Sequence, residues 1–247
     1  MIIYDQMIVG EGGIHIKPLY SILMKNNLGN MNECRTLIKH GFVEVNNQVI
    51  NDHRYVVHDD DKINVFGKAI HYQPFVYYMM NKPKGYICAN YDKNHLCVVD
   101  LIERNDCICV GRLDKDTTGF LLLTNDKSIV KALLLPQNHQ PKTYLVTTRF
   151  PIDENSIYRF EMGIVIDQDI CCLPAQLELI NTHQCYLTLH EGKYHQVKKM
   201  FLSCQNEVVD LKRIAFAGLV LDASLGYGEY RQLNQDEFQK LKELVCQ

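Results

Sequence analysis

Two carboxylates lie shortly before an uninterrupted apolar run in the segment GRLDKDTTGFLLLTND, residues 111–126. The run Gly119–Thr124 has the length of a buried strand, so Asp114 and Asp116 are expected at the end of a strand, beside the core. A carboxylate in that place is either a turn residue that accepts hydrogen bonds from backbone N–H groups, or a reactive group held on a rigid frame. Two carboxylates could also act as the acid and base of a glycosidase.

A metal ion is the other group that such residues could hold. The acidic segment matches the first half of a calcium loop, but Asn125 stands where that loop needs a bidentate glutamate. The cysteines include no Cys-x-x-Cys pair, and His190 and His195 are not spaced as the two ligands on one turn of a zinc-binding helix. We therefore expect no metal site.

The composition is that of a globular protein. The chain has 247 residues, of which 47% are hydrophobic, and a formal net charge of −3. No apolar run is long enough to span a membrane, and the first residues lack the basic and apolar regions of a secretory signal, so we expect a cytoplasmic protein without a membrane partner. Ten cysteines are scattered over apolar positions, which favours buried thiols over a disulfide framework.

Basic residues are unevenly distributed along the chain. Residues 71–150 hold ten Lys and Arg against seven Asp and Glu, whereas residues 151–247 hold nine against fourteen. Five basic residues of the acidic part lie close together in sequence: Lys193, Lys198, Lys199, Lys212 and Arg213. A local basic surface for RNA is one interpretation of this group, and ordinary solvated charge is the other.

Residues 16–68 have the pattern of a small α+β unit. KPLYSILMKNN is expected to form a short amphipathic helix, and NMNECRTLIKHG a second one with Asn30 or Asn32 as its N-cap. FVEVNNQVI then predicts a hairpin that turns at Asn-Asn, and DKINVFG predicts a closing strand. Residues 1–15 are expected to be an extension, and residues 69–76 a linker.

Strand patterns dominate residues 77–247. They include FVYYMM, YICAN, CICVGRL, GFLLLT, KTYLVTT, AQLELI and CYLTLH. Helices are expected chiefly at YHQVKKMFLSC and near the C-terminal end, where Asn234 and Glu237 are expected to form a cap. Strands in series with few helices predict an α+β domain with a mostly antiparallel sheet.

Four of these motifs, taken in order, resemble those of the bacterial family of small ribosomal pseudouridine synthases. GRLDKDTTGFLLLTND is similar to the signature Gly-Arg-Leu-Asp, two variable positions, Thr-x-Gly, an apolar strand and Thr-Asn/Asp-Asp. YYMMNKPKGYICA, KTYLV and EGKYHQVKKMF are similar to the other motifs. The small unit resembles the RNA-binding domain that this family shares with a protein of the small ribosomal subunit. The resemblance implies a pseudouridine synthase catalytic domain after a small N-terminal α+β RNA-binding domain.

The resemblance also implies a reaction and the residues for it. Pseudouridine formation breaks the glycosidic bond of a uridine, turns the base and rejoins it through carbon 5 without redox change, so no cofactor is expected. Asp114 would be the catalytic carboxylate, Lys198 the cation paired with it, and Tyr144 the ring that stacks on the uracil. The residues expected to complete the apolar pocket are Leu189 and Val197.

Other residues are assigned to RNA by the same resemblance. Arg112, two positions before Asp114 in the same strand, would contact the RNA backbone or occupy the space that the target base leaves. The basic residues expected to hold phosphates are Arg35, Lys39, Lys82, Lys84, Lys193 and Lys199. The family usually has Lys-Arg where this chain has Lys198 and Lys199, so Lys199 lacks the bidentate fork that an arginine offers to phosphate.

The expected substrate is one uridine of 16S rRNA. NYDKNHLCVVDLI resembles the Asp-x-x-His pattern of the small-subunit branch of the family. We expect a monomer that acts on folded or partly assembled RNA. The alternatives are a 23S rRNA synthase of the same family and a non-catalytic rRNA-binding assembly factor. A glycoside hydrolase would need a second carboxylate in a defined place.

Overall fold

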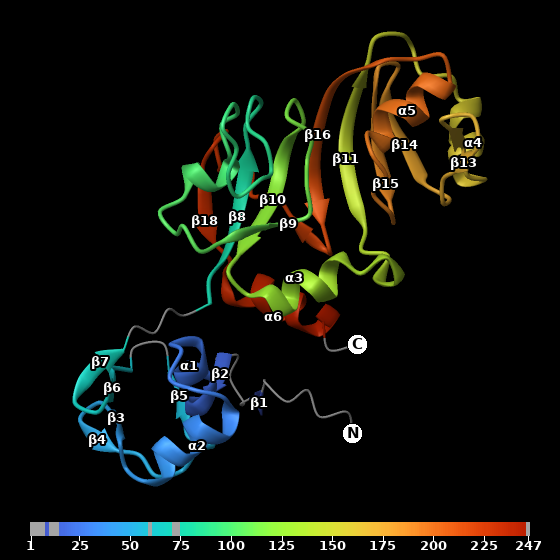
Figure 1. Ribbon diagram of the computed structural model, residues 1–247. Coiled ribbons are helices and arrows are strands. Elements are labelled where there is room, and N and C mark those ends of the chain that lie inside the picture. The colour runs from blue at the N-terminus through green and yellow to red at the C-terminus, as the bar shows by residue number, and fades with distance from the viewer. Residues whose placement is uncertain (1–7, 10–14, 59–60, 71–74, 246–247) are drawn as a thin grey trace. The chain divides into compact units, whose positions relative to one another are not determined.

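The chain divides into two compact units, with the boundary between Phe75 and Val76 (Figure 1). The computed structural model describes residues 8–9, 15–58, 61–70 and 75–245. Each unit buries a hydrophobic core of its own. No helix among these described residues is long and apolar enough to cross a membrane.

Two helices of the small unit match the predicted ones. They are α1 (Leu19–Lys25) and α2 (Met31–Lys39). Asn30 is the N-cap of α2: its side chain accepts hydrogen bonds from Asn32 N and Glu33 N, and the Glu33 carboxylate accepts one from Asn30 N. This reciprocal cap satisfies backbone donors that the first turn leaves free, and it selects Asn30 over Asn32 as the start of α2. Both helices bury an apolar face, which includes Leu19, Leu23, Cys34 and Ile38.

Short strands complete the small unit. They are β1 (Ile8–Val9), β2 (His15–Pro18), β3 (Val43–Val45), β4 (Gln48–Val49), β5 (Val56–Val57), β6 (Ile63–Val65) and β7 (Lys68–Ile70). The predicted hairpin joins β3 to β4, and Asn46 and Asn47 have the positive φ angles, 52° and 66°, that a tight hairpin turn requires. One sheet has the order β4-β3-β6-β7 and the other the order β1-β2-β5.

The limits of the small unit differ slightly from the predicted ones. β7 reaches Ile70 and pairs with β6, so residues 69–70 of the predicted linker belong to the sheet. β1 lies within the predicted extension and pairs with β2, which begins at His15. The remaining residues before His15 lie outside the described part of the chain.

Nine strands of the second unit form one sheet. They are β8 (Tyr77–Lys82), β9 (Ile108–Val110), β10 (Thr118–Thr124), β11 (Lys142–Thr148), β14 (Gln176–Asn181), β15 (Gln184–Leu189), β16 (Val208–Phe216), β17 (Leu219–Val220) and β18 (Tyr230–Gln232). The main path is β14-β15-β11-β16-β10-β8-β18, with β9 paired to β10 and β17 to β16. Among the described strands of this sheet, β10 and β16 are the one parallel pair, which confirms the predicted α+β class with a mostly antiparallel sheet.

Helices gather on the sheet in two groups (Figure 1). One group is α3 (Lys127–Leu134) with α6 (Gln235–Val245), which contact each other. The other lies at the β14–β15 end and comprises α4 (Asn155–Glu161), α5 (Gln196–Ser203) and the hairpin of β12 (Val165–Ile166) and β13 (Ile170–Cys171). Two 3-10 turns are η1 (Val98–Leu101) and η2 (Pro136–Asn138). The start of α6 carries the predicted cap, because Asn234 and Glu237 each accept the other's backbone N–H at 2.9 Å.

The central strand β10 is buried at all seven residues. β8 pairs along one edge of it, while β16 pairs with Thr118 and Gly119 and β9 pairs with Leu122–Thr124 along the other. Gly119 has a φ of +100°, and a Cβ added there would lie 2.2 Å from Arg213 O. The parallel contact between β10 and β16 therefore requires a glycine at this position of the motif.

Two strand predictions for this unit were wrong. β9 ends at Val110, so Arg112 and Asp114 follow the strand in a loop instead of ending it. YICAN forms no strand: its Ile87 makes only an isolated bridge to Cys97.

The cysteines behave mostly as predicted. The nine described ones are free thiols, and five of them are buried: Cys34, Cys97, Cys107, Cys172 and Cys185. Cys246 lies outside the described residues.

Candidate active site

Asp114 lies in the loop that joins β9 to β10. The loop turns at residues 114–117, where Thr117 N donates to Asp114 O at 3.1 Å. The preceding Leu113 is buried, and its backbone N donates to Cys88 Sγ at 3.3 Å. Thr117 is buried as well. The backbone is thus fixed on both sides of Asp114, whose own side chain stays 28% exposed.

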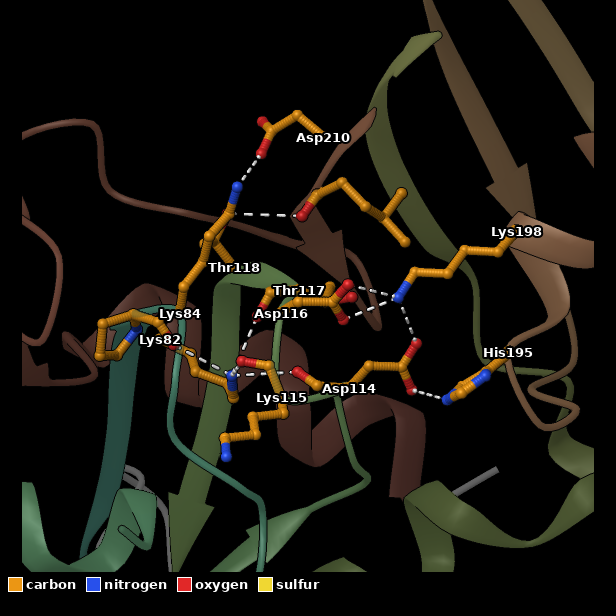
Figure 2. Close-up of polar contacts among 12 residues, drawn as sticks. Lys82, Lys84, Asp114, Lys115, Asp116, Thr117, Thr118, His195, Lys198 and Asp210 are labelled. Atoms are coloured by element: carbon orange, nitrogen blue, oxygen red, sulfur yellow. Dashed lines mark hydrogen bonds and ion pairs between the residues drawn. The ribbon is translucent and has the colours of Figure 1, made fainter. Parts of the chain in front are cut away.

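The carboxylate of Asp114 faces the segment that leads into α5. Lys198 Nζ lies 3.3 Å from Oδ2, and His195 Nε2 lies 3.6 Å from Oδ1 (Figure 2). His195 is the N-cap of α5 and has a left-handed backbone, with a φ of 52°. In the described part of the chain, the ion pairs of Asp114 are with side chains of this distant segment, which favours a reactive group over a turn residue.

Lys198 is shared between two carboxylates. Its Nζ donates to Asp116 Oδ1 at 2.7 Å and to Asp116 Oδ2 at 2.8 Å, which is closer than Asp114. Burial lowers the pKa of Lys198, but the hydrogen bond to Asp116 and the charges of both carboxylates outweigh it and leave the pKa raised. Burial likewise raises the pKa of Asp116, and its bond to Lys198 outweighs that and leaves the pKa lowered. Lys198 therefore stays a cation at neutral pH.

Lys82 does not belong to the RNA surface, contrary to the sequence prediction. It is 0% exposed, and its Nζ donates to the carbonyl oxygens of Pro83, Asp114 and Thr117 at 3.0, 3.1 and 2.9 Å (Figure 2). A longer bond of 3.4 Å reaches Lys115 O. Burial lowers the pKa of Lys82. The side chain holds the backbone of the Asp114 loop in place and cannot reach a phosphate.

Replacing Lys82 by methionine is expected to destabilise the protein by about 3 kcal/mol, because carbonyl oxygens of the Asp114 loop would be left buried without a donor. Urea-induced unfolding of the full chain measures this loss. Lys84→Met is the matched control, since Lys84 is an exposed lysine two residues along, and its effect is expected within about 0.5 kcal/mol. Equal effects of the two substitutions would contradict the role given to Lys82.

Tyr144, Leu189 and Val197 lie in one apolar cluster with Leu113. Tyr144 is on β11, opposite Leu187 on β15. All these side chains are buried, and Tyr144 is 9% exposed. The structure therefore brings the three predicted pocket residues together in the cluster that also anchors the Asp114 loop.

Arg213 is a buried cation opposite Tyr144 in the sheet, not part of a basic surface. It is 1% exposed, its Nε donates to Phe120 O at 2.8 Å, and its guanidinium lies 5.1 Å from the centre of the Phe216 ring. Among the described residues, its Nη2 has no hydrogen-bond partner. Burial, together with the charge of Arg213, lowers the pKa of Lys142 to about 8.

Three of the lysines predicted to hold phosphates are paired with carboxylates. The pairs are Lys84 with Asp210, Lys193 with Glu191, and Lys199 with Asp167. Arg112 and Lys39 are exposed. The guanidinium of Arg35 lies 4.7 Å from the centre of the Tyr20 ring. The charges of these three lysines are therefore balanced by the chain's own acids.

Residues 76–203 match the family model described as RNA pseudouridylate synthase, and residues 26–63 match the S4 domain. The first match covers more than half of the chain. This chain belongs to the RNA pseudouridylate synthase family. The synthase is thus an isomerase that acts on RNA, and its S4 domain confirms the predicted RNA-binding unit at the N-terminal side.

Relatives of the synthase align over most of its length. The "Uncharacterized RNA pseudouridine synthase YtzG" of Bacillus subtilis (strain 168) is 38% identical over 234 residues, covering 91% of this chain and 98% of that protein. The ribosomal small subunit pseudouridine synthase A of Pseudomonas aeruginosa is 38% identical over 210 residues, covering 83% and 91%. A crystal structure of a pseudouridylate synthase has a TM-score of 0.66 and 32% identity, covering 90% of this chain and 98% of that one.

Three residues of this site were not assigned from the sequence to the role that the structure gives them. His195 lies three positions before Lys198, and this proximity was a usable signal. Asp116 was considered only as a metal ligand or as the second acid of a glycosidase. Arg213 was grouped with the basic residues of a possible RNA surface, because a charged residue in an apolar segment normally indicates a solvent-facing position, but the fold buries it.

Proposed function

We propose that this synthase isomerises one uridine of 16S rRNA to pseudouridine, using Asp114 and no cofactor. The observation that carries the proposal is the setting of Asp114, a partly exposed carboxylate on a fixed loop with Lys198 at 3.3 Å. The apolar cluster with Tyr144 supplies a wall for the base. Among the described residues, no group of three or more His, Cys, Asp or Glu is arranged to hold a metal ion.

The proposed reaction breaks the bond between uracil N1 and ribose C1′ and joins C5 to C1′. C5 then loses its proton and N1 gains one, so the product is an isomer of the uridine. The Asp114 carboxylate can attack C1′, add to the base, or remove a sugar proton, and each route uses its charged form. The Lys198 ammonium lies where it can hold that charge. Tyr144 offers a ring that stacks on the base and a hydroxyl that can take part in proton removal at C5.

The target uridine must leave its stack to reach Asp114. Turning a base out of structured RNA costs a few kcal/mol, and stacking in the pocket together with phosphate contacts offsets this cost. Arg112 and Lys39 are exposed cations, and neither forms an ion pair with another described residue, so both can provide such contacts. We assign them to the RNA backbone in this proposal.

The choice of 16S rRNA rests on two observations. One of the relatives described above, that of Pseudomonas aeruginosa, carries the name ribosomal small subunit pseudouridine synthase A and aligns over 83% of this chain. The Asp-x-x-His pattern, which resembles that of the small-subunit branch, also forms a hydrogen-bonded turn. Asp92 Oδ1 accepts hydrogen bonds from Asn94 N at 2.8 Å and His95 N at 2.9 Å. The loop is therefore preordered, as a loop that reads the shape of folded RNA needs to be.

Incubation with 16S and 23S rRNA is expected to give pseudouridine at one position of 16S rRNA only. Folded or protein-bound 16S rRNA should be the better substrate than a short free oligonucleotide, because phosphates and 2′-hydroxyls of the folded RNA position the target. Carbodiimide mapping of both rRNAs measures this.

Each outcome of the mapping separates the proposal from its alternatives. Modification confined to 23S rRNA would contradict the proposed substrate but not the proposed reaction. Tight 16S rRNA binding without any pseudouridine would favour an assembly factor. In the proposal, the enzyme acts as a cytoplasmic monomer, and size-exclusion chromatography with light scattering tests the oligomeric state.

A further inference from the structure

Three lysines of the second unit are each held by a carboxylate, and they are called the paired lysines below. The pairs are Lys84 with Asp210 at 2.7 Å, Lys198 with Asp116 at 2.7 Å, and Lys199 with Asp167. Lys84 and Lys198 lie on opposite sides of the Asp114 loop (Figure 2). A phosphate that approaches one of these three lysines therefore meets a charge that is already balanced.

In the pairs that Lys198 and Lys199 of α5 form, the carboxylate is more exposed than the lysine. The side chain of Asp116 is 68% exposed and that of Lys198 is 28% exposed. For Asp167 and Lys199 the exposed fractions are 42% and 24%. An anion coming from solvent thus encounters the carboxylate before it can reach the ammonium group.

The carboxylates of Asp167 and Asp210 are held only by their lysines. In the described part of the chain, each makes no other side-chain hydrogen bond. Glu191 differs, because it also accepts from Leu173 N at 2.9 Å and from Gln196 Nε2 at 2.6 Å, and it is 15% exposed. Asp167 and Asp210 can leave their lysines without disturbing the fold, whereas Glu191 is part of it.

We propose that the RNA backbone displaces Asp167 and Asp210 from Lys199 and Lys84, so that these two carboxylates are exchangeable competitors of RNA phosphates. The proposal deepens the function proposed above and rests on it for the identity of the partner. An exposed Lys–carboxylate pair is weak, so a phosphate can replace the carboxylate one for one. The exchange favours RNA folds that present phosphates at several paired lysines together.

This exchange has a consequence for the salt dependence of binding. A free lysine that contacts a phosphate displaces counterions from the RNA, and this makes the affinity fall with salt. A paired lysine that gains a phosphate also returns a free carboxylate to solvent, which reduces the net change in charge. The synthase should therefore bind RNA more weakly, and with less salt dependence, than it would if these lysines had no carboxylate partners.

Removing either carboxylate is expected to tighten binding. Asp167→Asn and Asp210→Asn should each lower the Kd for a 16S rRNA transcript about two- to fivefold, the equivalent of one exposed ion pair. Each should steepen the slope of log Kd against log salt by about one. Fluorescence anisotropy over a salt series measures both. Asp167 has a φ of 50°, which asparagine also tolerates, so this variant is expected to fold.

Asp169→Asn is the matched control. Asp169 is exposed in the same β12–β13 turn, and among the described residues no ion pair of Asp169 is present. The variant removes the same charge two residues away, and it should leave both the Kd and the salt slope close to those of the wild type. An equal gain from Asp169→Asn would mean that general charge, not exchange at Lys199, controls the affinity.

A double-mutant cycle separates the pair from its surroundings. Lys199→Gln should weaken binding more in the Asp167→Asn background than in the wild type, because Lys199 is already free there. Unchanged or weaker binding by both asparagine variants, with circular dichroism like the wild type, would overturn the proposal. Since these measurements need no turnover, they stay decisive even if the synthase modifies a different RNA or none.

Discussion

Pseudouridine formation is expected to fall about 10⁴-fold or more when Asp114 is replaced by asparagine. The amide has nearly the same size as the carboxylate, but it can neither attack the sugar or base nor accept a proton. The fold should survive, because Lys82 holds the loop through backbone carbonyls and Lys198 keeps its bonds to Asp116. Single-turnover reactions with 16S rRNA, followed by carbodiimide mapping, measure the rate.

Asp116→Asn provides the comparison for this variant. It makes the same chemical change two residues away and removes the closer partner of Lys198, yet it leaves the Asp114 carboxylate in place. We expect this variant to be slower than the wild type but to retain measurable turnover. Turnover by Asp114→Asn at a comparable level would refute the assignment of the catalytic carboxylate. Thermal unfolding of both variants, and RNA binding by Asp114→Asn, should stay close to those of the wild type.

Replacing Tyr144 by phenylalanine is expected to slow the last step of the reaction about 10²- to 10⁴-fold while RNA binding is retained. The ring remains and still stacks on the base, whereas the hydroxyl that would serve proton removal at carbon 5 is lost. Release of tritium from RNA labelled at carbon 5 of uridine reports this step directly, and a filter-binding assay reports affinity.

Tyr186→Phe is the control for the tyrosine variant. Tyr186 lies on the neighbouring strand β15 opposite Leu145, so it points to the other face of the sheet from Tyr144, and it is 38% exposed. Its variant should release tritium at the wild-type rate. A wild-type rate for Tyr144→Phe in single turnover would show that the hydroxyl is dispensable and would leave the ring with stacking alone.

Local signals in the sequence determined much of the secondary structure. The asparagines at positions 46 and 47 predicted the hairpin turn, since asparagine tolerates positive φ angles. The pair Asn234 and Glu237 predicted the start of α6, and the apolar run before Asn125 predicted the buried strand β10. These features depend on residues within a few positions of one another. The sequence by itself therefore indicates where these elements begin and end.

The sequence also showed which residues to examine at the site. The resemblance of four ordered motifs singled out Asp114, Lys198 and Tyr144, and the structure places Lys198 beside Asp114. α3 and α4 were not predicted, nor was β16. In β16, Arg213 occupies an inward position and breaks the alternating apolar pattern that identifies a strand.

Only the tertiary structure decided what each charged residue does. Lys82 was predicted at the RNA surface, but the fold buries it under the loop that follows β9, more than thirty positions along the chain. Lys198 is 82 positions from Asp116, and Lys199 is 32 positions from Asp167. The sequence alone does not distinguish a charged side chain that is solvated from one that is buried or paired. Their state depends on which distant carbonyl or carboxylate the fold brings within hydrogen-bonding distance, because electrostatic and hydrogen-bond energies act through space and not along the chain.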